Sequence, residues 1–154
     1  MYNLLIKLKN FSAAHRLIKS YKGKCNHLHG HNYRLSLTIA SPSVDQSDLV
    51  IDFKVVRQVC DQWVQTHLDH ATIVCDADLP LLDFLKAHQQ HHYVMPEGQN
   101  SSAEALSRHL YDIFDRLIAK AAGQSADQIH LSCVEVWESD TSAAAYRPDS
   151  ARVL

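Results

Sequence analysis

The chain has 154 residues, of which 46% are hydrophobic and 21% charged, and its formal net charge is −2 at pH 7. These values are typical of one globular domain, and no apolar run reaches the roughly 18 residues that a membrane span requires. The four cysteines are scattered without CxxC spacing, so we expect free thiols and not a disulfide framework.

The first third of the chain alternates in the manner of two strands. Residues 2–8 place apolar side chains at every second position, and residues 33–39 repeat this pattern before a Ser-Pro-Ser turn ends it. We expect an antiparallel hairpin with a long connection at residues 16–28. Two lysines interrupt the apolar run within the first ten residues, which therefore do not resemble a signal peptide, and a cytoplasmic location is expected.

The middle of the chain predicts the first main helix and a less regular segment. A short strand at residues 49–53 is expected to precede a helix over about 54–68, where apolar residues recur at helical spacing. Asp52 is expected to be structural. The segment 71–99 has helical character at residues 79–88 and exposed loop sequence after them.

The last third predicts the second main helix and two strands. Ser101 and Glu104 have the spacing of a capping box, and Gly123 is expected to close the helix that they begin. Residues 129–138 alternate as a strand, and residues 143–147 are expected to form a short final strand. The element order predicts a single α+β domain.

Three histidines lie where the two N-terminal strands should meet. His29 and His31 flank Gly30 at the entry to the second strand, and alternation places both imidazoles on one face. His15 ends the first strand, so pairing of the hairpin brings the three rings together. Three imidazoles with an open fourth position are typical of a catalytic zinc site. A surface or hydrogen-bonded His-x-His pair without metal is the alternative.

Cys25 precedes His29 by four residues, and its role distinguishes two classes of protein. A free thiol beside Zn²⁺, Lys22 and Lys24 would have a lowered pKa and could act as a base or nucleophile. As a fourth zinc ligand, Cys25 would instead close the site and indicate a non-catalytic zinc-binding module.

The second half of the chain adds two candidate groups. Asp69 and His70 could form an oriented imidazole that transfers a proton, or they could cap a helix end. Glu138 ends an apolar strand, where it could bind the guanidine-like edge of a heterocycle by two hydrogen bonds. Simple solvation of the strand end is the alternative for Glu138.

Six blocks of residues occur in the order seen in 6-pyruvoyltetrahydropterin synthases and their relatives. The blocks are Phe11–His15, Cys25–His31, Ile51–Phe53, Leu68–His70, Ser101–Glu104 and Val136–Glu138. The chain therefore resembles this family from residue 11 to residue 138. Its Cys-x3-His-Gly-His spacing is similar to that of the QueD-type 6-carboxytetrahydropterin synthases, whereas pyruvoyl-forming enzymes usually place the cysteine two residues further back.

The resemblance implies a T-fold over residues 1–154, with an antiparallel sheet, two main helices on one face and an extended segment at about 71–99. It implies a homo-oligomer built from trimers, such as a hexamer, with active sites at subunit interfaces. The implied reaction is zinc-dependent conversion of 7,8-dihydroneopterin triphosphate to 6-carboxy-5,6,7,8-tetrahydropterin, acetaldehyde and triphosphate, in 7-deazaguanine and queuosine biosynthesis. A 6-pyruvoyltetrahydropterin synthase or a related pterin side-chain lyase is the alternative.

Matching positions imply roles for individual residues. By resemblance His15, His29 and His31 would bind Zn²⁺, and Cys25 would be the base that abstracts a proton. Zinc bound to the side-chain hydroxyls of the substrate would acidify the neighbouring C–H bond and stabilise the developing oxyanion.

By the same matching, Asp69 and His70 would activate the base, and Glu138 would anchor the pterin or relay protons. The second histidine that usually follows this Asp-His pair is Ala71 here, so the relay depends on His70 alone.

The N-terminal segment carries a concentration of positive charge. Residues 1–44 contain seven Lys and Arg residues and no Asp or Glu, whereas the remainder has eight cations and seventeen acids. This asymmetry predicts a local anion site, for which the triphosphate is the implied ligand and Arg16 and Lys24 are the candidate contacts. A solvated basic edge is the alternative. Nucleic-acid binding is the weaker interpretation, because no basic stripe occurs elsewhere.

Overall fold

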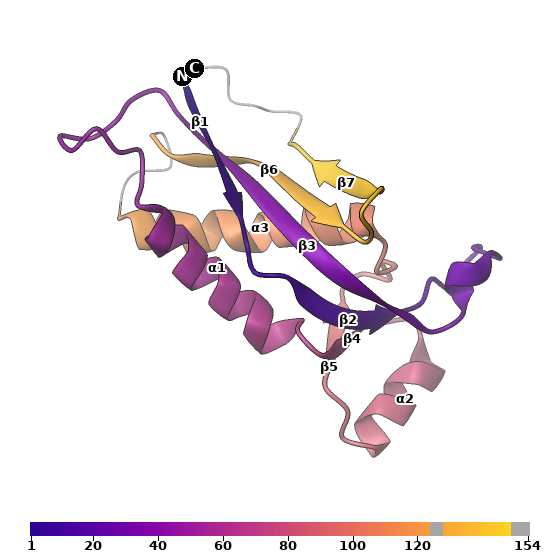
Figure 1. Ribbon diagram of the computed structural model, residues 1–154. Coiled ribbons are helices and arrows are strands. Elements are labelled where there is room, and N and C mark those ends of the chain that lie inside the picture. Colours follow the sequence, from indigo (N-terminus) through magenta and orange to yellow (C-terminus); the bar gives the residue numbers. More distant parts are fainter. Residues whose placement is uncertain (124–127, 149–154) are drawn as a thin grey trace.

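The computed structural model describes residues 1–123 and 128–148, in which two long helices lie along one face of a twisted sheet (Figure 1). The elements are β1 (Tyr2–Lys7), β2 (Phe11–His15), a 3₁₀ turn η1 (Lys24–Asn26), β3 (His29–Ser41), α1 (Phe53–His67), β4 (Ala71–Cys75), α2 (Leu79–Ala87), β5 (His92–Met95), α3 (Ala103–Ala122), β6 (His130–Trp137) and β7 (Ala143–Tyr146). The predicted α+β class is confirmed. Among these helices, none has the length and apolar character needed to cross a membrane.

The sheet is organised around β3, which is 13 residues long. Strands lie in the order β5-β4-β2-β3-β6-β7, and β1 pairs with β3 beyond the end of β2. The predicted hairpin is confirmed by the antiparallel pairing of β1 and β2 with the two halves of β3. The first strand is interrupted at residues 8–10, where the N–H of Lys9 turns away to donate to Asp61 on α1 (2.8 Å).

The prediction of a purely antiparallel sheet is wrong, because β4 pairs in parallel with both β2 and β5. The physical reason lies in the connections. Helix α2 joins β4 to β5 as a crossover, and a crossover returns the chain in the same direction. The segment 71–99 therefore contains two strands and a helix. Its β4 sequence, ATIVC, is buried along most of its length and lacks the alternation that identifies a half-exposed strand.

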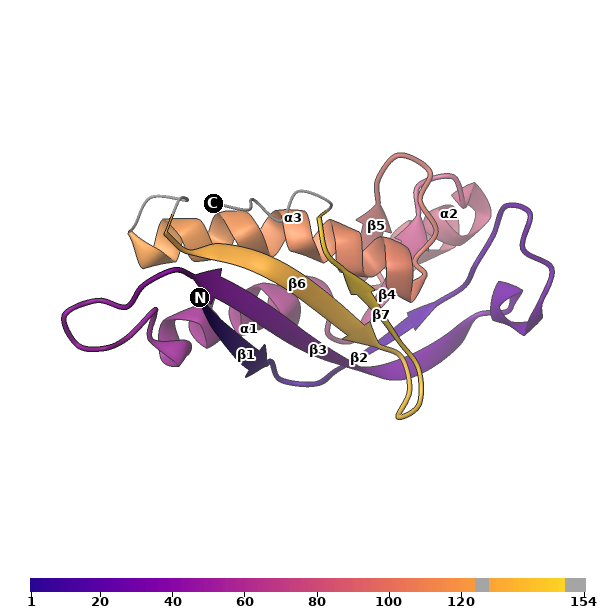
Figure 2. The same ribbon diagram turned by 90° about the horizontal axis from the view of Figure 1, so that it is seen from above.

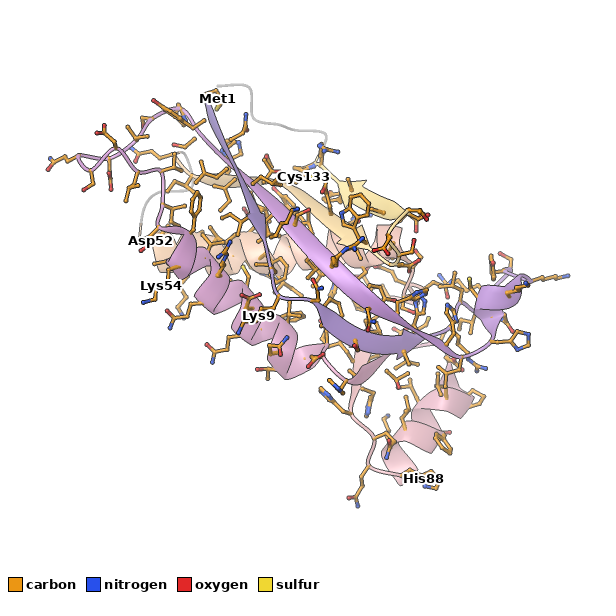
Figure 3. The ribbon with its side chains drawn as sticks, in the orientation of Figure 1. Met1, Lys9, Asp52, Lys54, His88 and Cys133 are labelled. Atoms are coloured by element: carbon orange, nitrogen blue, oxygen red, sulfur yellow. The ribbon has the colours of Figure 1, made fainter. Side chains whose placement is uncertain are left out.

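Both main helices begin after a residue whose side chain caps the first turn, and the cap of α3 is not the residue that the sequence predicted. The carboxylate of Asp52 accepts the N–H of Lys54 (2.8 Å) and caps α1. Figure 3 labels both residues at the start of this helix. The predicted strand at residues 49–53 is absent, because Asp45 accepts the N–H of Leu49 (3.0 Å) and folds this segment into a turn.

Helix α3 is capped by Ser102, whose hydroxyl accepts the N–H of Ala105 (3.3 Å), and not by Ser101 as expected. Gly123 ends the helix in the left-handed conformation (φ 62°) that favours glycine. The predicted cap was therefore misplaced by one residue, and Ser101 is fully buried instead.

The core lies between the inner face of the sheet and the apolar stripes of α1 and α3, which pack side by side on the same face (Figures 1 and 2). Helix α2 lies apart from them beside β4, where Val74, Leu82 and Leu85 form a second small cluster. The large buried side chains of the main core include Tyr33, Leu35, Leu37, Ile39, Leu106, Leu110 and Phe114. Burial of each such side chain contributes about 1.5–3 kcal/mol, which fixes the hairpin rigidly against the helices.

Candidate active site

Pairing of β2 with β3 brings the three predicted histidines together. His15 lies directly opposite His29, and Ala13 lies opposite His31, so all three imidazoles project from the same face of the sheet. One nitrogen from each ring lies within 4.8 Å of the others. This is the one group of three or more potential metal ligands found in the described part of the chain.

Hydrogen bonds to the backbone define the orientation of two rings. Nδ1 of His15 lies 2.7 Å from the carbonyl oxygen of Ser101, and Nδ1 of His29 lies 2.7 Å from that of His27. A carbonyl can only accept, so each Nδ1 carries the proton and each Nε2 keeps its lone pair. The two Nε2 atoms lie 3.2 Å apart. Two lone pairs at this distance require a cation between them.

A metal ion fits this requirement better than a proton. The pKa of His15 is lowered to about 4, mainly by burial; the hydrogen bond to the Ser101 carbonyl opposes this effect, and the neighbouring His29 and His31 add to it. Burial also lowers the pKa of His31. Neutral imidazoles with their other nitrogen bonded to backbone carbonyls are typical metal ligands. Two nitrogens in tetrahedral coordination at about 2.0–2.1 Å from zinc would lie about 3.3 Å apart, close to the observed separation.

Cys25 lies in η1 and is half-buried, but its sulfur does not join the three histidine nitrogens as a fourth close ligand. Among the described residues the three histidines thus form a group without a fourth close ligand, an arrangement typical of catalytic zinc sites.

The hydroxyl of Tyr21 is hydrogen-bonded to the Cys25 side chain, which raises the pKa of Tyr21. Gly23 makes room for this contact, since a Cβ at that position would lie 2.2 Å from the Tyr21 oxygen.

Hydrogen bonds fix the loop that carries Cys25 to the residues that follow β2 and precede α3. The N–H of Leu17 donates to the carbonyl of Cys25 (2.7 Å), and the Asn26 amide donates to the carbonyl of Leu17 (2.8 Å). The side chain of Asn100 bonds to both the N–H and the carbonyl of Ile18 (2.9 and 3.2 Å). Cys25 is consequently held at the end of β2 by contacts from both sides of the loop.

The two candidate anion contacts differ in availability. Nε and Nη2 of Arg16 donate to the two carboxylate oxygens of Asp78 (2.7 and 2.6 Å), and this pairing lowers the pKa of the Asp78 carboxyl. Asp78 is buried, so the pair links the loop to the start of α2. Lys24 is exposed in η1. Of the two, Lys24 is the side chain that can turn freely toward an anion.

Glu138 follows β6 and reaches the histidine cluster from the far half of the sequence. Its Oε1 lies 3.9 Å from Nε2 of His15. Burial raises the pKa of Glu138, the charge of Glu104 raises it further, and His29 opposes both. Glu104, expected to be a capping residue only, is therefore in electrostatic reach of the site.

Asp69 and His70 form the predicted pair, with Oδ2 of Asp69 2.9 Å from Nδ1 of His70. The N–H of Ser12 donates to the other carboxylate oxygen (3.0 Å). These hydrogen bonds lower the pKa of Asp69 despite the opposing effect of partial burial. The His70 side chain is 82% exposed.

The Asp-His pair lies on the opposite face of the sheet from the histidine cluster. Ser12 and Asn32 alternate with the ligand positions along β2 and β3. They line an open pocket of about 420 Å³ together with His70 and His91, and His31 also borders this pocket. Cys25 lies at the other end of β2, where its carbonyl accepts the N–H of Leu17, two residues after the strand ends. Within a single chain, the structure therefore does not bring His70 to Cys25.

Tyr33 is a neighbour of the cluster that sequence reasoning missed. It follows His31 by two residues on β3, and strand parity alone could have placed it on the same face. Its ring lies edge-on to His31 and His15, at centroid distances of 5.5 and 6.0 Å. Burial raises the pKa of Tyr33, and negative charge on Glu138 and Cys25 acts in the same direction.

The family model described as 6-pyruvoyl tetrahydropterin synthase matches residues 5–149. The chain belongs to this family. A curated relative from Rickettsia bellii, named 6-carboxy-5,6,7,8-tetrahydropterin synthase, is 34% identical over 110 residues, which cover 70% of this chain and 77% of the relative. Relatives of the same name from Aquifex aeolicus and Bacillus subtilis are 30% and 27% identical, over 82% and 94% of this chain and 77% and 84% of each relative.

Solved structures support the fold of this 6-pyruvoyl tetrahydropterin synthase family member. An uncharacterised protein from Wolinella succinogenes is similar with a TM-score of 0.78 at 18% identity, covering 96% of this chain and 98% of that protein. The 6-pyruvoyl tetrahydropterin synthase from Plasmodium vivax has a TM-score of 0.71 at 21% identity, covering 94% and 96%. The predicted T-fold is confirmed.

Proposed function

We propose that this chain is a zinc-dependent 6-carboxy-5,6,7,8-tetrahydropterin synthase, which converts 7,8-dihydroneopterin triphosphate to 6-carboxy-5,6,7,8-tetrahydropterin, acetaldehyde and triphosphate. The observation that carries the proposal is the pair of Nε2 atoms 3.2 Å apart on His15 and His29, with a third histidine beside them and no fourth close ligand from residues 1–123 or 128–148. The curated relatives of that name, two of which are 34% and 30% identical to this chain, support this choice of product.

His15, His29 and His31 would hold the metal. Bound zinc would supply Lewis-acid polarisation of the side-chain oxygens of the substrate. The backbone carbonyls of Ser101 and His27 keep the ligand tautomers correct, so the protein presents lone pairs to the metal without rearrangement.

The remaining residues act on the organic substrate. Cys25, outside the ligand group, removes a proton from the substrate side chain as the general base. Glu138 accepts hydrogen bonds from the guanidine-like edge of the pterin, which is the common role of a carboxylate toward that group. Lys24 and the other exposed cations of the N-terminal segment bind the triphosphate, with Arg16 positioning the loop through Asp78.

The Asp69–His70 pair becomes useful only if copies of the chain assemble. Because the pair lies on the face of β2 opposite the histidines, it can serve Cys25 of a neighbouring copy. The proposal therefore includes a homo-oligomer built from trimers, with each active site at a subunit interface. It further includes a single T-fold domain, a cytoplasmic location and a role in queuosine biosynthesis.

Product analysis tests the proposal directly. The zinc-loaded protein is incubated with 7,8-dihydroneopterin triphosphate, and the products are identified by mass spectrometry. Release of acetaldehyde with the 6-carboxy product is expected. A 6-pyruvoyl product without acetaldehyde would assign the chain to the other branch of the family.

The Cys25→Ala variant distinguishes an enzyme from a non-catalytic zinc module. We expect this variant to retain zinc and lose turnover, since Cys25 is not among the close ligands. Loss of zinc from the variant would instead indicate a closed structural site.

A further inference from the structure

Tyr33 has an unusual hydroxyl for a residue of the core. Its side chain is completely buried. In the described part of the chain, its oxygen is the one buried side-chain polar atom without a hydrogen-bond partner. Such atoms are rare in native proteins, because a buried hydroxyl that loses water and gains no partner is destabilising.

Other tyrosines in contact with the core do have partners. The hydroxyl of Tyr93 lies 2.6 Å from Nε2 of His109, and the hydroxyl of Tyr111 donates to the carbonyl of Leu131 (2.7 Å). Phenylalanine would pack in the place of Tyr33 without the unpaired oxygen, since the ring already stacks on Phe11 at 5.0 Å. The fold alone therefore does not account for the oxygen.

The position of Tyr33 connects the oxygen with the metal centre. Its ring meets His15 and His31 edge-on, and both are ligand residues of the proposed site. The hydroxyl is also within electrostatic reach of Glu138 and Cys25, which belong to two other elements of the same site. A neutral phenol donates one hydrogen bond, so the partner that this hydroxyl lacks is an acceptor.

We propose that Tyr33 donates a hydrogen bond to a side-chain oxygen of the pterin bound at the histidine cluster, and thereby selects pterins with hydroxylated side chains. The assignment rests on the proposed function for the class of ligand. It makes Tyr33 a specificity-determining residue, because a site that holds an unpaired donor discriminates against ligands that lack the acceptor.

The test compares two pterins on zinc-loaded Tyr33→Phe and wild-type protein by isothermal titration calorimetry. Neopterin carries a hydroxylated side chain, whereas 6-methylpterin does not. We expect Tyr33→Phe to bind neopterin about threefold to tenfold more weakly, the effect of one neutral hydrogen bond, and to bind 6-methylpterin as the wild type does. The thermal midpoint without ligand should be equal or higher, because the variant removes an unpaired buried group.

Tyr93→Phe is the matched control, since it removes a hydroxyl that has a partner in His109. It should lower the thermal midpoint and leave neopterin affinity unchanged. Equal weakening of both pterins by Tyr33→Phe, or no weakening, would overturn the proposed contact. A lowered midpoint would also overturn it, since the hydroxyl would then have a partner such as a trapped water.

The outcome is separable from that of the proposed function. If the wild-type protein binds neopterin more tightly than 6-methylpterin through Tyr33 but forms no 6-carboxy product, the proposed hydrogen bond is supported and the assigned reaction is overturned. Wild-type protein that binds neither pterin would overturn both.

Discussion

Acidifying the metal-free protein should destabilise it through His15. Burial lowers the pKa of this imidazole to about 4 in the folded protein, whereas the ordinary value of 6.5 applies in the unfolded chain. As the pH falls, the unfolded state therefore takes up the proton first, and unfolding becomes more favourable. The stability associated with neutral His15 is fully present above pH 6.5 and is lost as the pH falls from 6.5 toward 4.

The magnitude follows from the difference between the two pKa values, 6.5 and about 4. Each pKa unit corresponds to about 1.4 kcal/mol, so the free energy of unfolding should fall by about 2 kcal/mol at pH 5 and about 3 kcal/mol at pH 4. Solvent screening does not reduce this loss much, because His15 is only 1% exposed.

Urea unfolding after removal of the metal by a chelator measures the effect at neutral pH and at two pH values within the window. His15→Asn is the control, since an amide can still donate to the Ser101 carbonyl but does not titrate. Carboxylates contribute the same background in both proteins, and the difference between their stability curves isolates His15. Curves that stay parallel from pH 6.5 to 4 would refute the burial of a neutral imidazole at this position.

Three further predictions concern other parts of the site and its support. Ser102→Ala should lower the free energy of unfolding by about 1 kcal/mol because α3 loses its cap, and an unchanged urea midpoint would remove Ser102 from that role. Gly23→Ala should displace the exposed Tyr21 hydroxyl from Cys25 with little loss of stability. Iodoacetamide labelling of the native protein should then be faster at Cys25, the one cysteine that is not buried, and an unchanged rate would contradict the contact. Cys25→Ala and Asp69→Asn should each abolish turnover, but their co-expression should restore about a quarter of it if each site combines two copies. Failure of the mixture to recover activity would place both residues in one chain.

The histidine cluster could be predicted because its geometry is local. A period of two places His29 and His31 on one face, and the alternating pattern of the first strand brings His15 to meet them. The same parity extends to Tyr33, so strand alternation could also have identified this missed residue as a neighbour of the cluster. Its lack of a partner could not be foreseen, since that depends on every side chain around the oxygen.

The elements that sequence reasoning missed depend on distant contacts. The strand at Ala71–Cys75 is buried between β2 and β5, and burial from several sides removes the alternation that would have revealed it. The turn before α1 is set by the carboxylate of Asp45. The N-cap of α3 lies one residue later than expected, and the carbonyl of Ser101 accepts a hydrogen bond from His15 instead. The separation of His70 from Cys25 follows from the sheet order, which no local pattern encodes.

The anchoring of the Cys25 loop bears on how turnover is limited. The backbone of Leu17 is hydrogen-bonded to both Cys25 and Asn26. The side chain of the preceding residue, Arg16, is paired with Asp78. Cys25, the proposed base, is therefore held in place before the substrate arrives. The conformational entropy of the loop is lost on folding and not again at each encounter, so more of the binding energy remains for the chemical step. Loop closure should then contribute little to the rate, and product release or proton transfer becomes the slow event.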